Sequence, residues 1–188
     1  MKHLAEMNYM FCNKIIPNVG SPHLDYGCKN GLGTNLLALQ CRHSTIVGYD
    51  QNQEMIQKAR ENRKENLIHL TFTDTLEYIP QAHFKSASAN LVYHEDPKLF
   101  QNIYPLMAMG GKIVVLDHDL KGISTSEYKS RFNIPEGDTS QDEFLKHSYP
   151  KQTSSDLSDC IKSAREAGFK VRGQNSSRGF FTLIAERA

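Results

Sequence analysis

The feature that most constrains the fold is the alternation of short apolar runs with segments of helical period. The runs at residues 45–49 and 112–116 have the length and the β-branched composition of buried strands. Between such runs lie segments like residues 53–64, where Met55 and Ile56 begin an apolar face among charged residues. Strands that alternate with helices form βαβ units, so the sequence predicts an α/β protein built on a parallel sheet.

A chain of 188 residues fits one domain, which we place at residues 1–188. Residues 119–153 are polar and long for a connection, so they are expected to form a lid or substrate insertion. Gly110 and Gly111 are expected to end a helix. The predicted strands lie at about 24–26, 45–49, 67–73, 84–88, 112–116, 169–173 and 179–185, and the predicted helices at about 33–41, 53–64, 98–109 and 156–167.

The charge balance and the cysteines exclude several classes of function. Lys plus Arg number 22 and Asp plus Glu number 21, so charge alone would not attract nucleic acid or an anionic membrane. The four cysteines form no CxxC pair and no zinc-type spacing with histidines, so no metal site is expected. No signal peptide and no membrane-spanning run is recognisable, and we expect a cytoplasmic protein.

Residues 23–34 combine a short strand, a glycine-rich turn and a helix start. Gly27 and Gly31 supply positions where φ can be positive or a ligand can approach the backbone, whereas Lys29 stands where another glycine is expected. Asp50 ends the second strand, 23 positions after Gly27, and is well placed to accept hydrogen bonds from ribose hydroxyls. Either NAD or S-adenosylmethionine (SAM) carries such a ribose.

A dinucleotide fingerprint that starts at Gly27 would require glycine at positions 29 and 32. The chain has Lys29 and Leu32 there, which disfavours a nicotinamide-dependent oxidoreductase. Other polar residues also follow predicted strands, with Asp74 after the third and Asn90 after the fourth. Because the carboxyl ends of parallel strands meet at one edge of a sheet, these residues are expected to converge on one crevice.

In this order the motifs resemble those of the class I SAM-dependent methyltransferases, in particular the small-molecule, type 11-like branch. The resemblance covers roughly residues 23–118. It rests on Asp25-Tyr-Gly-Cys-Lys-Asn-Gly31, Gly48-Tyr-Asp50, Glu54-Met-Ile-Gln-Lys-Ala-Arg60, Thr73-Asp74-Thr75-Leu76, Asn90-Leu-Val-Tyr-His-Glu-Asp-Pro97 and Gly110-Gly-Lys-Ile-Val-Val-Leu116. It implies a three-layer, doubly wound Rossmann-like sheet that is mostly parallel, with an antiparallel last strand.

The resemblance also implies roles for single residues. Asp25, Gly27 and Gly31 would shape the pocket for the methionine part of SAM, Asp50 would hold the ribose, and Asp74 with Thr75 would border the adenine. The other residues of the predicted cofactor site are Cys28, Gln51 and Asn90. The implied reaction is SN2 transfer of a methyl group, with S-adenosylhomocysteine as the product, and it depends mainly on alignment of the nucleophile with the methyl group.

His94 follows the fourth strand on the substrate side of the expected pocket and is the first candidate for a base or substrate contact, with His118 after it. A surface histidine is the alternative for His94. Asp50 has an alternative role as a helix N-cap, which Asn52 could fill instead, and Asp74 has an alternative role as a cap of the segment after it.

The leading hypothesis is therefore a SAM-dependent methyltransferase that acts on a small molecule as a monomer or homodimer, without nucleic-acid or membrane partners. A non-catalytic binding protein of the same fold, with a cofactor site impaired by Lys29, is the alternative.

Overall fold

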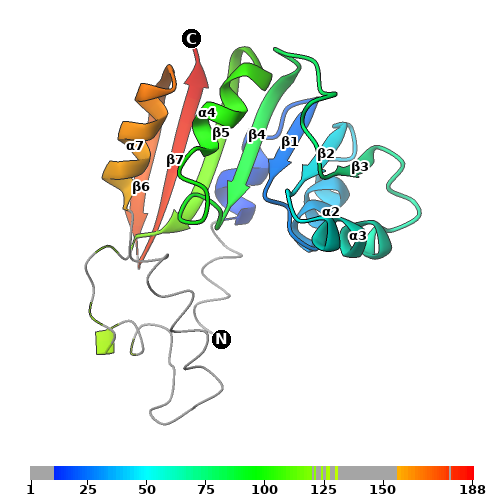
Figure 1. Cartoon of the computed structure of the whole chain (residues 1–188), viewed down its shortest axis with the longest axis horizontal. Helices are drawn as coiled ribbons and strands as arrows, with labels where there is room; N and C mark the ends of the chain where they lie inside the picture. Colours follow the sequence, from blue (N-terminus) through cyan, green and yellow to red (C-terminus); the bar gives the residue numbers. More distant parts are fainter. Residues whose placement is uncertain are drawn as a thin grey trace.

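The described residues of the chain form one mixed sheet of seven strands (Figure 1). The computed structural model describes residues 11–119, 121, 124, 126, 127, 130, 156–177 and 179–188. The strand order is β3-β2-β1-β4-β5-β7-β6. The strands are β1 (His23–Tyr26), β2 (Ile46–Tyr49), β3 (Leu70–Thr73), β4 (Phe84–Asn90), β5 (Met107–His118), β6 (Phe169–Ser177) and β7 (Phe180–Arg187).

Strands β1 to β5 pair in parallel, whereas β7 is antiparallel to both β5 and β6. This arrangement confirms the predicted doubly wound sheet that is mostly parallel, with the last strand antiparallel. The order of the strands reverses at β1, which has β2 on one side and β4 on the other. Ligand sites in such sheets lie at the carboxyl ends of the strands beside this reversal.

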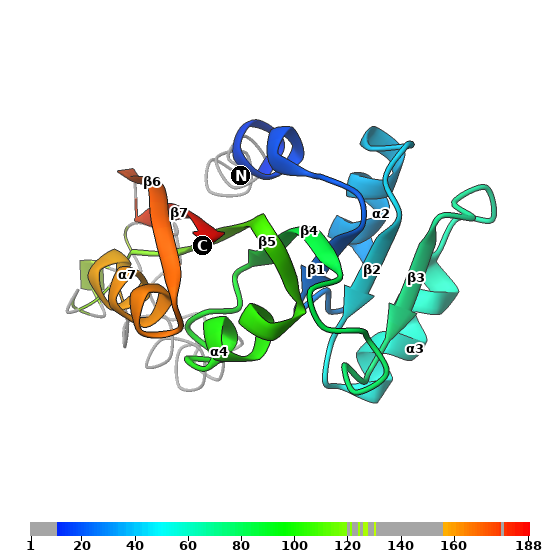
Figure 2. The same cartoon turned by 90° about the horizontal axis from the view of Figure 1, so that it is seen from above.

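Helices cover both faces of the sheet and make the three layers (Figure 2). Their bounds are η1 (Phe11–Ile15), η2 (Ile16–Asn18), α2 (Leu32–Gln40), α3 (Gln53–Asn62), α4 (Leu99–Ile103), η3 (Tyr104–Leu106) and α7 (Leu157–Glu166). Two hydrophobic clusters separate the layers, one that includes α4 and α7 and one that includes η1, α2 and α3. Within β5, Ile113 and Val115 enter the first cluster and Val114 and Leu116 the second, because successive strand side chains point to opposite faces.

The predicted helix at residues 98–109 differs from the structure. Helix α4 ends at Ile103, a single 3-10 turn containing Pro105 follows, and Met107 already pairs with β4. Gly110 therefore lies inside β5 and does not end a helix. Gly110 has a φ of 72° and lies where the register between β4 and β5 shifts. A glycine with positive φ is common at a β-bulge as well as at the end of a helix, so the glycine pair does not distinguish the two.

The predicted insertion at residues 119–153 lies largely outside the described residues, so a lid or substrate insertion there stays a prediction. Within the part of the chain that the structure describes, no helix is both long and apolar enough to cross a membrane.

Candidate functional site

The turn after β1 is held against the end of β2. The backbone N–H groups of Gly27 and Cys28 both donate to the carbonyl of Tyr49, at 2.7 and 2.8 Å. Gly27 has a φ of 74°, and a Cβ at this position would lie 2.3 Å from Cγ2 of Val92 in the loop after β4. The turn therefore requires glycine both for its backbone angle and for the close approach of that loop.

Asp50 lies directly after β2 and binds the same turn. Its Oδ2 accepts the backbone N–H of Lys29 at 2.9 Å, and its Oδ1 accepts the backbone N–H of Asn52 at 2.9 Å. Asn52 is the N-cap of α3, since its side chain accepts from the N–H groups of Glu54 and Met55. Asn52 thus fills the capping role, and each oxygen of the Asp50 carboxylate keeps a lone pair for a ligand hydroxyl.

An open pocket lies at the carboxyl ends of β1, β2 and β4, beside the reversal of strand order. The lining residues are Tyr26, Gly27, Lys29, Tyr49, Asp50, Gln51, Val92, Glu95 and Asp96. Three of these carry carboxylates and one carries an ammonium group.

One wall of the pocket is fixed by a contact between distant segments. The hydroxyl of Tyr26 donates to Oδ2 of Asp96 at 2.7 Å and accepts from Asn102 at 3.0 Å. The ring of Tyr26 also packs against Tyr49, with the ring centres 5.0 Å apart. Burial, and then the hydrogen bond to Asp96, raises the pKa of Tyr26, so this hydroxyl remains a donor at neutral pH.

Beneath the glycine turn lies a buried chain of polar side chains. Ser88 donates to Oδ1 of Asp25 at 2.8 Å, and Thr34 donates to Oδ2 at 2.6 Å. The ring of His23 bridges the two β4 serines, with Nε2 3.0 Å from Oγ of Ser88 and Nδ1 2.7 Å from Oγ of Ser86. Burial lowers the pKa of His23 to about 3, so the imidazole is neutral. Asp25 therefore anchors the first turn of α2 to β4 from below the pocket.

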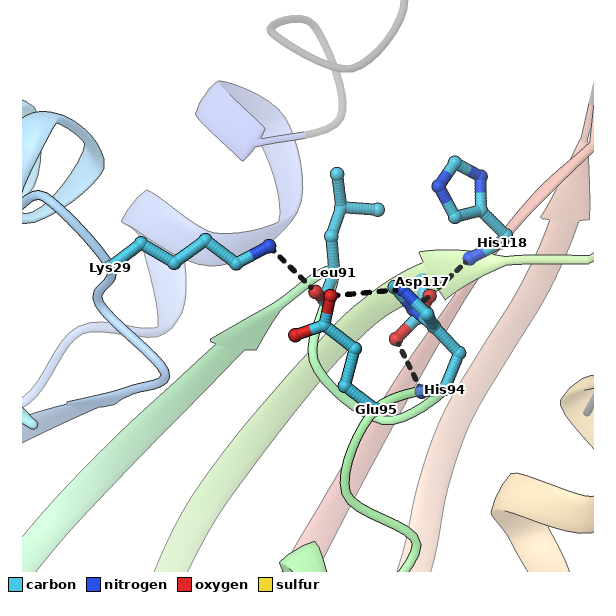
Figure 3. A network of polar contacts seen from close by, with 6 residues as sticks. All are labelled: Lys29, Leu91, His94, Glu95, Asp117 and His118. Carbon is cyan, nitrogen blue, oxygen red and sulfur yellow. Dashed lines mark hydrogen bonds and ion pairs between the residues drawn. The ribbon is translucent and has the colours of Figure 1, made fainter. Parts of the chain in front are cut away.

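His94 and Asp117 form a close pair at the ends of β4 and β5 (Figure 3). Nδ1 of His94 lies 2.6 Å from Oδ1 of Asp117, and its backbone N–H donates to Oδ2 at 3.2 Å. Nε2 of His94 lies 3.6 Å from Oε1 of Glu95, which lines the pocket. Burial lowers the His94 pKa, but the hydrogen bonds to Asp117 and Glu95 and their negative charges outweigh it and raise the pKa to about 9. At neutral pH His94 is therefore an imidazolium.

The structure separates the predicted cofactor residues into groups by their position. Three of them line the pocket: Gly27, Asp50 and Gln51. Three lie behind the turn that shapes it, where they are buried: Asp25, Cys28 and Gly31. Asp74 and Thr75 lie in the turn after β3, one strand away, and do not line the pocket.

The remaining predicted residues lie toward β5. Asn90 ends β4, and its Oδ1 is buried without a hydrogen-bond partner among the described residues. His118 ends β5, where its ring stacks on Phe180 with 5.1 Å between the ring centres. It also meets the ring of His94 edge-on at 5.5 Å. The two candidate catalytic histidines are thus neighbours, with His94 the nearer to the pocket through Glu95.

Sequence reasoning missed five of the lining residues: Tyr26, Tyr49, Val92, Glu95 and Asp96. Glu95 and Asp96 belong to the Asn90–Pro97 motif, so the sequence does indicate that they lie in the loop after β4. It does not indicate the contact of Asp96 with Tyr26, 70 residues away.

Comparison with known proteins agrees with this geometry. A family model described as a methyltransferase domain matches residues 17–167. A SAM-dependent methyltransferase from Mesorhizobium loti has a similar structure, with a TM-score of 0.68, 16% identity and coverage of 96% of this chain and 98% of that one. A protein from Sulfolobus solfataricus assigned to the type 11 methyltransferases has a TM-score of 0.65 at 16% identity, covering 96% of this chain and 91% of its own.

Two curated proteins match only part of the chain. The ribosomal protein L11 methyltransferase of Burkholderia orbicola (strain MC0-3) is 25% identical over 96 residues, which are 51% of this chain and 31% of that protein. The trans-aconitate 2-methyltransferase of Sinorhizobium medicae (strain WSM419) is 28% identical over 97 residues, 50% of this chain and 37% of its own. The matched segment is about a third of the length of these relatives. With a family model that covers most of its length and a sheet of the matching topology, the chain belongs to the methyltransferase-domain family.

Proposed function

We propose that the protein transfers a methyl group from SAM to a small-molecule acceptor. The observation that carries this proposal is the pocket at the β1 turn, where Asp50 presents a carboxylate with lone pairs to spare beside the backbone of Gly27. An acid at the end of the second strand is suited to the two hydroxyls of a ribose. The family to which the chain belongs supports SAM as the ligand.

The charges around the pocket favour the same ligand. Asp50, Glu95 and Asp96 bring three carboxylates to the lining, and Lys29 brings one ammonium group. SAM carries a positive sulfonium and a positive ammonium group, so a mainly acidic lining suits it. Asp74 and Thr75, one strand further along the same edge of the sheet, are proposed to border the adenine.

When bound, SAM supplies a methyl group activated by the sulfonium, and the chain contributes alignment and charge. Glu95 and the loop after β4 form the side of the pocket toward β5, where the acceptor would approach. His94 as an imidazolium suits a contact to a negative or hydrogen-bonding group of the acceptor better than the role of a base at neutral pH. The small-molecule class of the acceptor follows from the resemblance of the motifs to the small-molecule, type 11-like branch.

Calorimetric titration of the purified protein with SAM and with S-adenosylhomocysteine tests the proposal. We expect both to bind, and we expect Asp50→Ala to weaken binding by about 1.5–3 kcal/mol, the worth of a charge-assisted hydrogen bond. Glu61→Ala is the matched control, because Glu61 is an exposed carboxylate of α3 that does not line the pocket. Absence of binding at millimolar ligand would overturn the proposal, and an Asp50→Ala protein with parental affinity would remove the ribose assignment.

Lys29 favours a second function, a binding protein of the same fold that no longer uses SAM, because its side chain lines the pocket where glycine is usual in the family. The same titration separates the two functions, since only the methyltransferase requires affinity for SAM. Release of S-adenosylhomocysteine in the presence of a panel of small acceptors then tests the transfer itself.

A further inference from the structure

Lys29 is the basic residue in a pocket lining that is otherwise acidic or uncharged. Its Nζ reaches across from the β1 turn to the loop after β4 and donates to the carbonyl of Leu91 at 3.2 Å (Figure 3). Among the described residues, no carboxylate forms an ion pair with this ammonium group, although Asp50, Glu95 and Asp96 line the same pocket. The ammonium group of Lys29 is therefore bonded to a neutral carbonyl oxygen and borders the pocket.

The root of the side chain is fixed in an unusual backbone conformation. Lys29 has a φ of 52°, a left-handed angle that glycine adopts more readily, and its N–H donates to Oδ2 of Asp50 at 2.9 Å. Lys29 therefore keeps the backbone conformation that a glycine would have at this position, at a cost in free energy. The hydrogen bond to Asp50 holds the backbone from which the side chain leaves the turn, and its ammonium lies at the pocket, where it meets the carbonyl of Leu91.

The charges of SAM are opposite in sign to those of the pocket lining. SAM carries two positive groups, the sulfonium and the ammonium, and one negative group, the carboxylate. Asp50, Glu95 and Asp96 repel a carboxylate, and among the lining residues only Lys29 attracts one. We propose that Lys29 recognises the carboxylate of the methionine part of SAM, exchanging its bond to the neutral Leu91 carbonyl for an ion pair with the ligand. This inference rests on the function proposed above and assigns one of its specificity-determining residues.

The exchange is favourable because it pairs the ammonium with a charged acceptor in place of a neutral one. The bond to the Leu91 carbonyl pairs the ammonium with a neutral acceptor, whereas a carboxylate in the pocket would add the attraction between opposite charges. In this view Lys29 does not obstruct the pocket. A glycine at this position would let the ligand approach the backbone, whereas Lys29 offers the carboxylate of the ligand a charged contact.

The test compares SAM with decarboxylated SAM, which keeps the nucleoside, the sulfonium and the amine but lacks the carboxylate. Calorimetry gives the ratio of the two affinities for the parent protein and for Lys29→Met, which keeps the length of the side chain without its charge. We expect the parent to prefer SAM by about ten- to a hundred-fold, and we expect Lys29→Met to lose this preference while binding decarboxylated SAM as the parent does. Lys58→Met, on the exposed side of α3, is expected to keep the parental ratio.

Each other outcome overturns the inference in a recognisable way. An equal preference for SAM in the parent and in Lys29→Met would show that the lysine does not recognise the carboxylate. Tighter binding of both ligands by Lys29→Met and by Lys29→Gly would show that the lysine obstructs the pocket. If the parent protein bound neither ligand at millimolar concentration, the proposed function would fail together with the inference, whereas the first two outcomes leave that function intact.

Discussion

Gly27 and Gly110 have nearly the same backbone angle in very different surroundings. Their φ values are 74° and 72°. A Cβ on Gly27 would lie 2.3 and 2.8 Å from the two methyl groups of Val92, whereas a Cβ on Gly110 would meet nothing within 4 Å. Replacement of each by alanine therefore separates the cost of the backbone angle from the cost of a collision at the pocket.

The expected losses follow from these distances. An alanine in the left-handed region costs about 1–2 kcal/mol, and Gly110→Ala should lose only this amount of unfolding free energy. At Gly27 the collision adds the cost of overpacking, about 1–3 kcal/mol, because Val92 is 6% exposed and packs in the core. Gly27→Ala should thus destabilise the protein by about 2–5 kcal/mol in total.

Urea unfolding measures both losses, and a double-mutant cycle with Val92→Ala isolates the collision. In the cycle, Gly27→Ala should cost less on the Val92→Ala background, because the two methyl groups that it meets are gone. Two results would refute the reasoning: equal losses for Gly27→Ala and Gly110→Ala, or losses for Gly27→Ala and Val92→Ala that add within about 0.5 kcal/mol.

Three further predictions concern the groups around the pocket. Ser88→Ala should lower the unfolding free energy by about 1–3 kcal/mol in urea, because buried Asp25 loses a donor. The pKa of His94 rises from 6.5 to about 9 on folding, so its contribution to stability is complete below about pH 6.5 and is lost as the pH rises through about 9. Asp117→Asn should flatten this dependence of the unfolding free energy on pH, and an unchanged slope would contradict the prediction. Finally, Lys29→Gly should be more stable than Lys29→Ala by about 1 kcal/mol, because glycine adopts the left-handed angle at lower cost. At Lys58, inside α3, the alanine variant should be the more stable of the two, as is usual in a helix.

The central strands could be predicted because, as in β1 and the second half of β5, they are buried on both faces, whereas the helices are buried on one. Strands of that kind are continuous apolar runs, as at residues 112–116, and the crossover α3 has one apolar face. The start of β5 could not be predicted in this way. Residues Met107–Met109 suit a helix as well as a strand, and their pairing with β4 depends on Phe84, which lies more than twenty positions earlier.

The site was predictable where it depends on the ends of strands and not where it depends on contacts between loops. Asp50 and Gly27 line the pocket because each directly follows a strand that the sequence marks. The charge state of His94 depends on Asp117, 23 positions later and on another strand, and no spacing in the sequence indicates that contact. A histidine that looks like a candidate base in the sequence is, in the fold, a cation held between carboxylates.

Lys29 shows why a departure from a motif is best judged by what the backbone does. The lysine keeps the left-handed angle that a glycine would have, and its N–H still binds the Asp50 carboxylate, so the turn retains its path. The substitution therefore adds a side chain and a charge without removing the turn on which the pocket depends. Since the added ammonium faces a lining with three carboxylates, its effect falls on the charge of the ligand that the pocket accepts, more than on whether a pocket exists.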